Sequence, residues 1–186
     1  MAQKRGVRED PRITRTRNLI RGALNQLIEE KPFSSVSVQD IAERATINRA
    51  TFYAHFEDKY DLLEDLVREN YRRDLSKYDC VASPSISGLI QAIMLETMEH
   101  VRGRKKCKVD KEFEPQLERA MQDELHEYLS PVLGDAPALV VSSAVIGATL
   151  KWRAGRYKEA PDVLVKGLVS VLTGGVRIKR PLSAVT

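Results

Sequence analysis

The sequence predicts an all-α fold: an N-terminal three-helix domain that contains a helix-turn-helix, followed by a C-terminal helical domain. Three observations support this prediction. Apolar residues recur at positions i, i+3, i+4 and i+7 through much of the 186-residue chain. Proline and glycine mark the ends of these segments. No stretch shows the alternation of apolar and polar residues that is typical of a β-strand.

The first helix is expected to begin at Asp10 and Pro11 and to end at Lys31 and Pro32. The Asp10 carboxylate can cap the free N–H groups of the first turn, and Pro11 fits there because no N–H is needed. Its apolar stripe consists of Leu19, Ile20, Ala23, Leu24, Leu27 and Ile28.

Residues 37–55 predict two short helices joined by a tight turn. Ser37 can cap the first helix, with Asp40 three residues later, and Asn48 can cap the second. The second helix would bury Phe52 and expose a set of groove-sized side chains. These are Arg49, Ala50, Thr51, Tyr53 and His55. A short helix with this surface beside a basic arm is suited to a DNA groove.

Basic residues crowd the N-terminus, although the net charge of the chain is only +4. They are Lys4, Arg5, Arg8, Arg12, Arg15, Arg17 and Arg21. The arm over residues 1–10 can be read as a solvated tail or as a segment that contacts phosphates or the minor groove. The neighbouring helix-turn-helix favours the second reading, with Arg12 and Arg15 as further DNA contacts.

The remainder of the chain predicts a fourth helix and then a second helical domain. The expected helices are 58–76, 89–101, 114–133, 138–154 and 161–173. Residues 82–88 are a linker or the start of the next helix, and the basic segment 103–108 is a solvated loop. Gly134 and Pro137 are expected to break the chain. The boundary divides a DNA-binding domain, 1–75, from a regulatory domain, 76–186.

Residues 15–70 resemble the signature of the TetR/AcrR family of bacterial transcriptional regulators. The matching features are Ser37, the pair Ile41-Ala42, the turn near Thr46, Tyr53, Phe56 and Lys59. Thr46 departs from the usual glycine of the family, which predicts a strained or tightened turn. Asn48 replaces the common Ser or Thr and caps a helix equally well.

The resemblance implies backbone contacts for Tyr53 and Lys59, which would form a phosphate clamp. Ser37 can contact a phosphate in addition to capping its helix. His55 can donate to a phosphate, with a cap at the helix end as the alternative, and Tyr53 can instead pack into the core. For base contacts, Arg49 can reach a guanine edge, with a phosphate contact or a plain surface charge as alternatives.

Ala50 would turn its methyl group to the groove. Thr51 can bond a base or phosphate, or only favour the helix start.

The C-terminal half carries two less specific patterns. An apolar set can line a ligand cavity or form ordinary core: Met94, Met98, Met121, Tyr128 and Trp152. The last two helices hold more apolar surface than one domain edge should expose, which predicts a two-fold four-helix interface, as the family forms. The expected contacts are Val141, Ala144, Val145, Gly147, Ala148, Leu164, Leu168 and Leu172.

The resemblance implies a homodimeric repressor that binds a palindromic double-stranded operator and is released by a small-molecule effector. One alternative is an activator or co-regulator that answers to a protein partner. The other is a small-molecule-binding helical enzyme, against which the lack of any catalytic spacing around His55, His100 and His126 argues.

No cofactor or metal is implied. Cys80 and Cys107 are expected to be free thiols, with a redox pair as the alternative. The charged N-terminus and the short apolar runs predict a cytoplasmic protein without a membrane segment.

Overall fold

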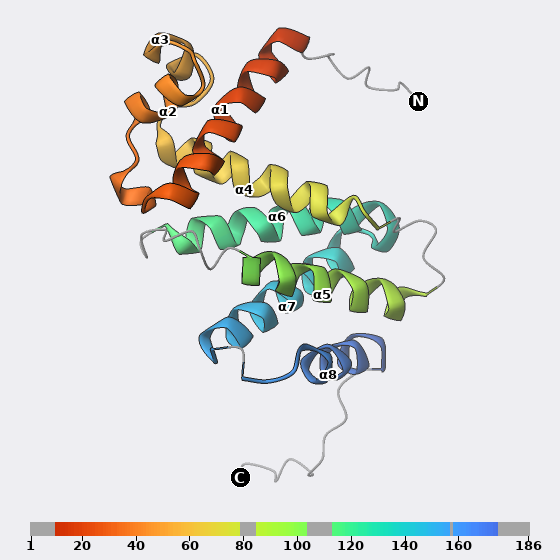
Figure 1. The fold of residues 1–186 in the computed structure, drawn as a ribbon. Coiled ribbons are helices and arrows are strands. Elements are labelled where there is room, and N and C mark those ends of the chain that lie inside the picture. The colour runs from red at the N-terminus through yellow and green to blue at the C-terminus, as the bar shows by residue number, and fades with distance from the viewer. Residues whose placement is uncertain (1–9, 79–84, 104–112, 157, 175–186) are drawn as a thin grey trace, which may run out of the picture. The chain divides into compact units, whose positions relative to one another are not determined.

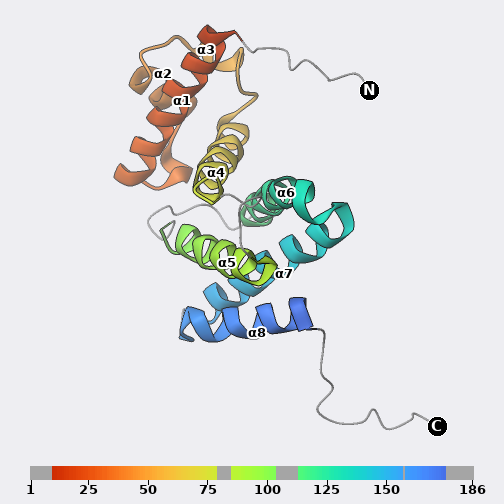
Figure 2. The same cartoon turned by 90° about the vertical axis from the view of Figure 1, so that its right-hand side faces the viewer.

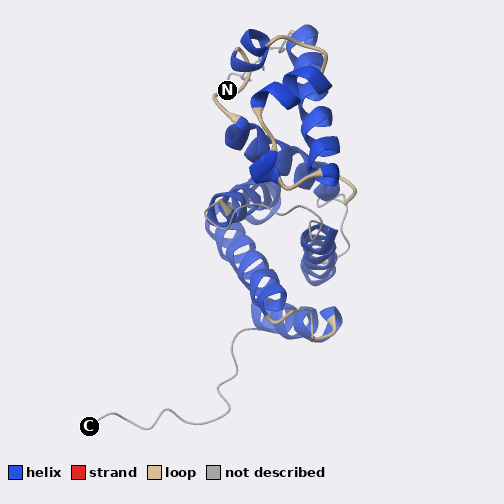
Figure 3. Cartoon of the chain, turned by 60° about the vertical axis from the view of Figure 1, so that its left-hand side comes forward, coloured by secondary structure: helices blue, strands red, loops and turns tan. Residues whose placement is uncertain are grey.

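The computed structural model describes residues 10–78, 85–103, 113–156 and 158–174, and within these ranges the chain is helical without strands (Figures 1 and 3). The predicted all-α fold is confirmed. The elements are α1 (Pro11–Glu30), η1 (Phe33–Ser35), α2 (Val38–Arg44), α3 (Arg49–Tyr53), α4 (Lys59–Leu75), α5 (Ile86–Gly103), α6 (Glu114–Leu133), α7 (Asp135–Ala154) and α8 (Pro161–Gly174). None of the described helices is both long and apolar enough to cross a bilayer.

The chain divides into two compact units. The first unit comprises Met1–Val67 with Lys106–Gln116, and the second comprises Arg68–Lys105 with Leu117–Thr186. The division falls inside α4, eight residues before the domain boundary expected at residue 75.

The first unit is built around large apolar side chains of α1, η1, α2, α3 and α4. Those without exposed surface are Ile20, Leu24, Phe33, Ile41, Phe52 and Leu62. α1 packs on α2, and α2 packs on α3. The predicted cap of α1 is confirmed, because the Asp10 carboxylate accepts a hydrogen bond from the Arg12 N–H at 2.9 Å.

An ion-pair cluster ties α1 to α4 within the first unit. Asp65 Oδ1 accepts hydrogen bonds from Arg17 Nη2 at 2.8 Å and from Arg21 Nη2 at 3.0 Å. Burial raises the pKa of Asp65, but the hydrogen bonds from the two arginines outweigh it and leave that pKa below its usual value. Both guanidinium groups are therefore committed to the fold.

The second unit consists of longer helices whose core is mainly aliphatic. α5 packs against α7 and α8, which also pack on each other, as the views in Figures 1 and 2 agree. Polar contacts join α4 to its neighbours: the Tyr71 hydroxyl lies 2.6 Å from Thr97 Oγ1, and Arg72 holds Glu124 of α6 with two hydrogen bonds of 3.0 and 2.7 Å.

One predicted boundary is wrong. α7 begins at Asp135, three residues before the expected start, and Pro137 lies in its first turn. Proline is tolerated there because the first N–H groups of a helix have no intrahelical partner. Gly134 alone separates α6 from α7, with φ of 82° at the N-cap of α7.

α5 begins at Ile86, three residues before the expected stripe, so part of residues 82–88 is the start of this helix, and the other helix ends lie within two residues of the expected ones. Residues 1–9, 104–108, Cys80 and Cys107, about which the sequence made predictions, lie outside the described residues.

Candidate nucleic-acid interface

The start of α2 is fixed by a reciprocal pair of hydrogen bonds. Ser37 Oγ accepts from the Asp40 N–H at 3.1 Å, and Asp40 Oδ2 accepts from the Ser37 N–H at 2.7 Å. Hydrogen bonds from the Ser37 hydroxyl and N–H, and the nearby Lys31 ammonium, hold the pKa of Asp40 well below its usual range. The predicted capping role of Ser37 is confirmed.

The turn between α2 and α3 contains a residue in the left-handed region. Thr46 has φ of 57°. Its N–H donates to Glu43 O at 3.1 Å, and the N–H of Ile47 donates to Ala42 O at 2.9 Å, so the turn is closed by backbone bonds. A β-branched side chain is disfavoured at this φ. The strain expected from the missing glycine is therefore present.

α3 begins at a second polar cap. Asn48 Oδ1 accepts from the Thr51 N–H at 2.7 Å and from the Thr51 hydroxyl at 2.9 Å. The hydroxyl proton of Thr51 is thus used inside the protein, in line with its role at the helix start. Phe52 and Phe56 are buried and anchor α3 on the first unit.

The opposite face of α3 is exposed. Arg49 and Ala50 are open to solvent, and half of the Tyr53 side chain is exposed. Arg49 lies one turn before Tyr53, with Nη2 3.4 Å from the Tyr53 hydroxyl and the guanidinium 5.8 Å from the ring centre. His55 follows in the next turn and is partly exposed. The structure therefore places these four predicted residues together on or beside one short helix.

Lys59 has a role that the sequence did not indicate. Its ammonium donates to the carbonyl oxygens of Phe33, Ser34 and Val36 at 3.2, 3.2 and 2.8 Å. The same ammonium lies 4.8 Å from the centre of the Phe33 ring and 5.3 Å from that of Tyr60. An ammonium has three protons, and each has an acceptor here. A phosphate contact by this ammonium stays a prediction.

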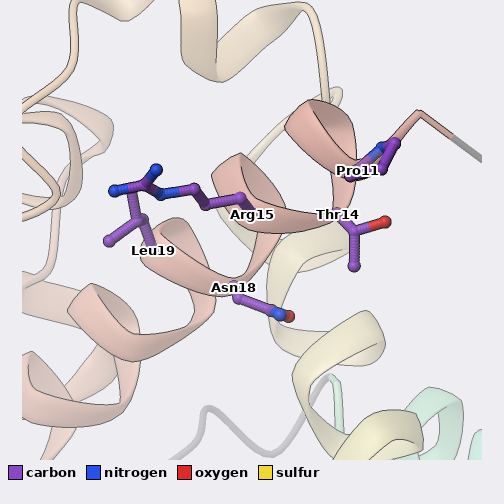
Figure 4. A pocket seen from close by; sticks show the side chains of 5 residues that line it. All are labelled: Pro11, Thr14, Arg15, Asn18 and Leu19. Atoms are coloured by element: carbon purple, nitrogen blue, oxygen red, sulfur yellow. The ribbon is translucent and has the colours of Figure 1, made fainter.

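The four arginines of α1 fall into two pairs. Arg17 and Arg21 bind Asp65, whereas Arg12 and Arg15 are exposed and have no ion-pair partner among the described residues. Arg15 and Leu19 project from the same side of α1 beside an open hollow of about 600 Å³ (Figure 4). Arg12 and Arg15 are thus the arginines of α1 that remain available to an external anion.

The five residues predicted to line a ligand cavity all belong to the second unit, and four of them are buried. Met94, Met98, Met121 and Trp152 are buried. Tyr128 is half-buried, and its hydroxyl donates to the carbonyl oxygen of Tyr78. Their use as a ligand-binding set stays a prediction.

The predicted dimer contacts require a correction. Val141 and Val145 are buried inside the second unit, so they contribute core packing and not external surface. The exposed side of α7 carries Val140, which was not predicted and is 59% exposed, and Gly147, a predicted contact whose surroundings are open. The other five predicted contacts are partly exposed: Ala144, Ala148, Leu164, Leu168 and Leu172.

The helix-turn-helix matches a known family. Residues 20–66 fit the family described as bacterial regulatory proteins, tetR family. Residues 20–66 are therefore a DNA-binding domain of the tetR family. An uncharacterized HTH-type transcriptional regulator of Bacillus subtilis, YxbF, is 30% identical over 84 residues, which are 45% of this chain and 22% of that protein. Another from Haemophilus influenzae is 39% identical over 64 residues, 34% of this chain and 31% of that protein. The matches span less than a third of these two relatives.

Solved structures of TetR-family regulators share the fold over most of this chain. A regulator from a Rhodococcus species has a TM-score of 0.63 at 15% identity, covering 88% of this chain and 99% of that one. FadR of Thermus thermophilus, solved in complex with lauroyl-CoA, gives 0.62 at 16% identity, covering 90% and 98%. FadR of Bacillus subtilis, in complex with stearoyl-CoA, gives 0.55 at 15% identity, covering 86% and 99%. At these identities the likeness establishes the fold alone.

Proposed function

We propose that this TetR-family regulator binds a palindromic DNA operator as a homodimer and acts as a repressor that a small-molecule effector releases. The observation that carries the proposal is the exposed face of α3, where Arg49, Ala50 and Tyr53 project from a helix anchored by buried Phe52 and Phe56. A short helix fixed at both ends by caps and core presents its side chains rigidly, as base reading in the major groove requires.

The proposed DNA contacts fall into two kinds, contacts to bases and contacts to phosphates. Arg49 is the base reader, because a guanidinium can donate two hydrogen bonds to a guanine edge, and Ala50 turns its methyl group to the same groove. Ser37, Tyr53 and His55 act on phosphates, together with Arg12 and Arg15 of α1. Such contacts set the position of the protein on the duplex without selecting a sequence.

A second copy is needed to read a palindrome, and α7 and α8 supply a surface for it. Large apolar side chains are exposed on both helices: Leu139, Val140, Val163 and Val171. Around them lie small or partly exposed residues, Gly147 among them, that allow close helix approach. A two-fold contact here would place two α3 helices on half-sites about 34 Å apart.

The effector would bind the second unit and favour a dimer whose α3 helices no longer fit both half-sites. The acyl-CoA molecules bound to the two FadR proteins support a small molecule as the signal. The close packing of Met94 and Met98 instead supports the alternative, control by a protein partner. In either case the protein would act in the bacterial cytoplasm, where the DNA lies.

Selection of bound duplexes from a random-sequence pool tests the proposal. The full chain should enrich a palindrome, bind it far more tightly than a scrambled duplex at physiological salt, and sediment as a dimer on it. Equal affinity for selected and scrambled duplexes would contradict the proposal. Release of the selected duplex by fractionated small-molecule extract, but not by the protein fraction, would decide between the two kinds of signal.

A further inference from the structure

A hollow lies at the corner between α7 and α8. Its lining shares one residue, Trp152, with the five residues predicted to line a ligand cavity. It has a volume of about 450 Å³ and lies wholly in the second unit. Its lining residues are Lys151, Trp152, Gly155, Lys158, Glu159 and Leu164. This volume falls in the range of about 300–1,000 Å³ that is usual for small-molecule sites.

The floor of the hollow is apolar and fixed in place. Trp152 is only 3% exposed, and its indole N–H donates to the carbonyl oxygen of Glu159 at 2.8 Å, which holds the α7–α8 connection against α7. The Arg102 guanidinium lies 5.3 Å from the indole ring centre. Leu164, near the start of α8, adds a partly exposed aliphatic wall.

The rim of the hollow is positively charged. Lys151 and Lys158 are both exposed, and neither ammonium has an ion-pair partner among the described residues. Glu159 is the acidic residue of the lining, so the lining carries two positive charges against one negative charge. An apolar floor beneath an excess of positive charge favours a ligand with an apolar body and an anionic end.

We propose that this hollow binds an amphipathic organic anion, with the carboxylate at Lys151 and Lys158 and the apolar body on Trp152 and Leu164. The site would thereby define the chemical class of the effector, and in that respect it rests on the function proposed above. Binding itself requires no DNA.

Titration of the full chain with octanoate, in the absence of DNA, tests the site. Trp152 is the single tryptophan of the protein, so its fluorescence reports on the floor of the hollow, and calorimetry gives an independent affinity. Octanoate should bind saturably and shift the Trp152 emission. Octanamide, which lacks the charge, and acetate, which lacks the apolar body, should each bind at least tenfold more weakly. Equal affinity for octanoate and octanamide, or no saturable binding, would overturn the proposal.

Substitutions locate the binding. The double variant Lys151→Gln/Lys158→Gln should lose at least tenfold in octanoate affinity. Lys166→Gln is the control for loss of positive charge elsewhere on α8, because Lys166 is exposed and outside the lining, and it should change affinity less than twofold. A loss of tenfold or more in this control as well would show that the effect is not confined to the lining and would overturn the assignment.

The outcome is independent of the DNA-binding proposal. A protein that selects an operator but ignores octanoate contradicts this site alone, whereas one that binds octanoate but selects no operator contradicts the regulatory function alone.

Discussion

The two units use polar side chains in different ways. In the first unit, carboxylate and amide groups cap the starts of helices within three residues, as Asp10, Ser37 with Asp40, and Asn48 do. Charged groups that join distant helices occur in both units: Arg17 and Arg21 bind Asp65 in the first, and the second unit holds several such pairs. Examples are Arg72 with Glu124, His100 with Asp74, and Arg153 with Glu118.

The difference follows from helix length. α2 and α3 have seven and five residues, too few to be stable alone, so their unpaired N–H groups must be satisfied locally. α6 and α7 have 20 residues each and are held mainly by their buried faces. Local caps leave the surface of α3 free for a ligand, whereas cross-helix pairs fix the interior of the second unit.

The largest expected effect lies in a cross-helix pair. Arg72→Met should lower the free energy of unfolding by about 2–3 kcal/mol, because it leaves the Glu124 carboxylate, only 5% exposed, without its two-point partner. Denaturant titration measures this change. Arg73→Met is the control: this arginine is exposed, and within the described part of the chain its guanidinium bonds only the Asn70 side chain, so about 0.5 kcal/mol or less is expected. Similar losses in both variants would break the distinction between the units.

The next largest loss of unfolding free energy is expected at Lys59. Lys59→Met keeps the aliphatic stem but removes hydrogen bonds to three carbonyl oxygens, so a loss of about 1.5–2 kcal/mol is expected. Operator affinity should fall with the fold, while the slope of log affinity against log salt stays the same. Lys31→Met, which removes only an ion pair with Asp40, should cost less than about 1 kcal/mol. Unchanged stability with a slope smaller by about one unit would instead make Lys59 a phosphate contact.

The capping carboxylate gives a dependence on pH. The pKa of Asp40 is lowered in the folded protein by Ser37, so the ionised form stabilises the fold above the unfolded pKa of about 4, and this stabilisation is lost as the pH falls below it. Asp40→Asn should therefore flatten the decline in unfolding free energy between about pH 5 and pH 3. Parallel profiles for the variant and the natural protein would mean that the capping carboxylate does not titrate with folding.

The smallest expected change in the free energy of unfolding should be the same in both units. Thr46 and Arg156 each have φ of 57°, a conformation that costs a side-chain-bearing residue about 1 kcal/mol. Thr46→Gly and Arg156→Gly should each raise the free energy of unfolding by about 0.5 kcal/mol, after the greater flexibility of glycine in the unfolded chain is counted. Thr46→Ala should give no such gain. A gain at only one site would show that its surroundings, and not φ, decide the result.

Local features could be predicted from the sequence because both partners lie close together in it. The caps at Asp10, Ser37 and Asn48 are of this kind, and so is the strained turn at Thr46. The carbonyl partners of Lys59 lie 23–26 residues away, so no local pattern reveals them.

In α7 part of the predicted exposed side was wrong, because the predicted side was rotated about the helix axis relative to the observed one. Successive residues of a helix differ by about 100° in direction, and a helix that is apolar nearly all round does not reveal which side is buried. Val141 is therefore buried and Val140 exposed, a distinction that only the packing of α5, α7 and α8 decides.

The central claim is that the exposed face of α3 reads DNA sequence, and the base preference of Arg49→Ala tests it most directly. Affinities for every single-base variant of the selected operator should be measured for the natural protein and for this variant. We expect Arg49→Ala to lose discrimination at one base pair in each half-site, by about 1–3 kcal/mol, and to keep the preference elsewhere. An unchanged preference, or a uniform loss at every position, would contradict the assignment of α3 as the reading helix.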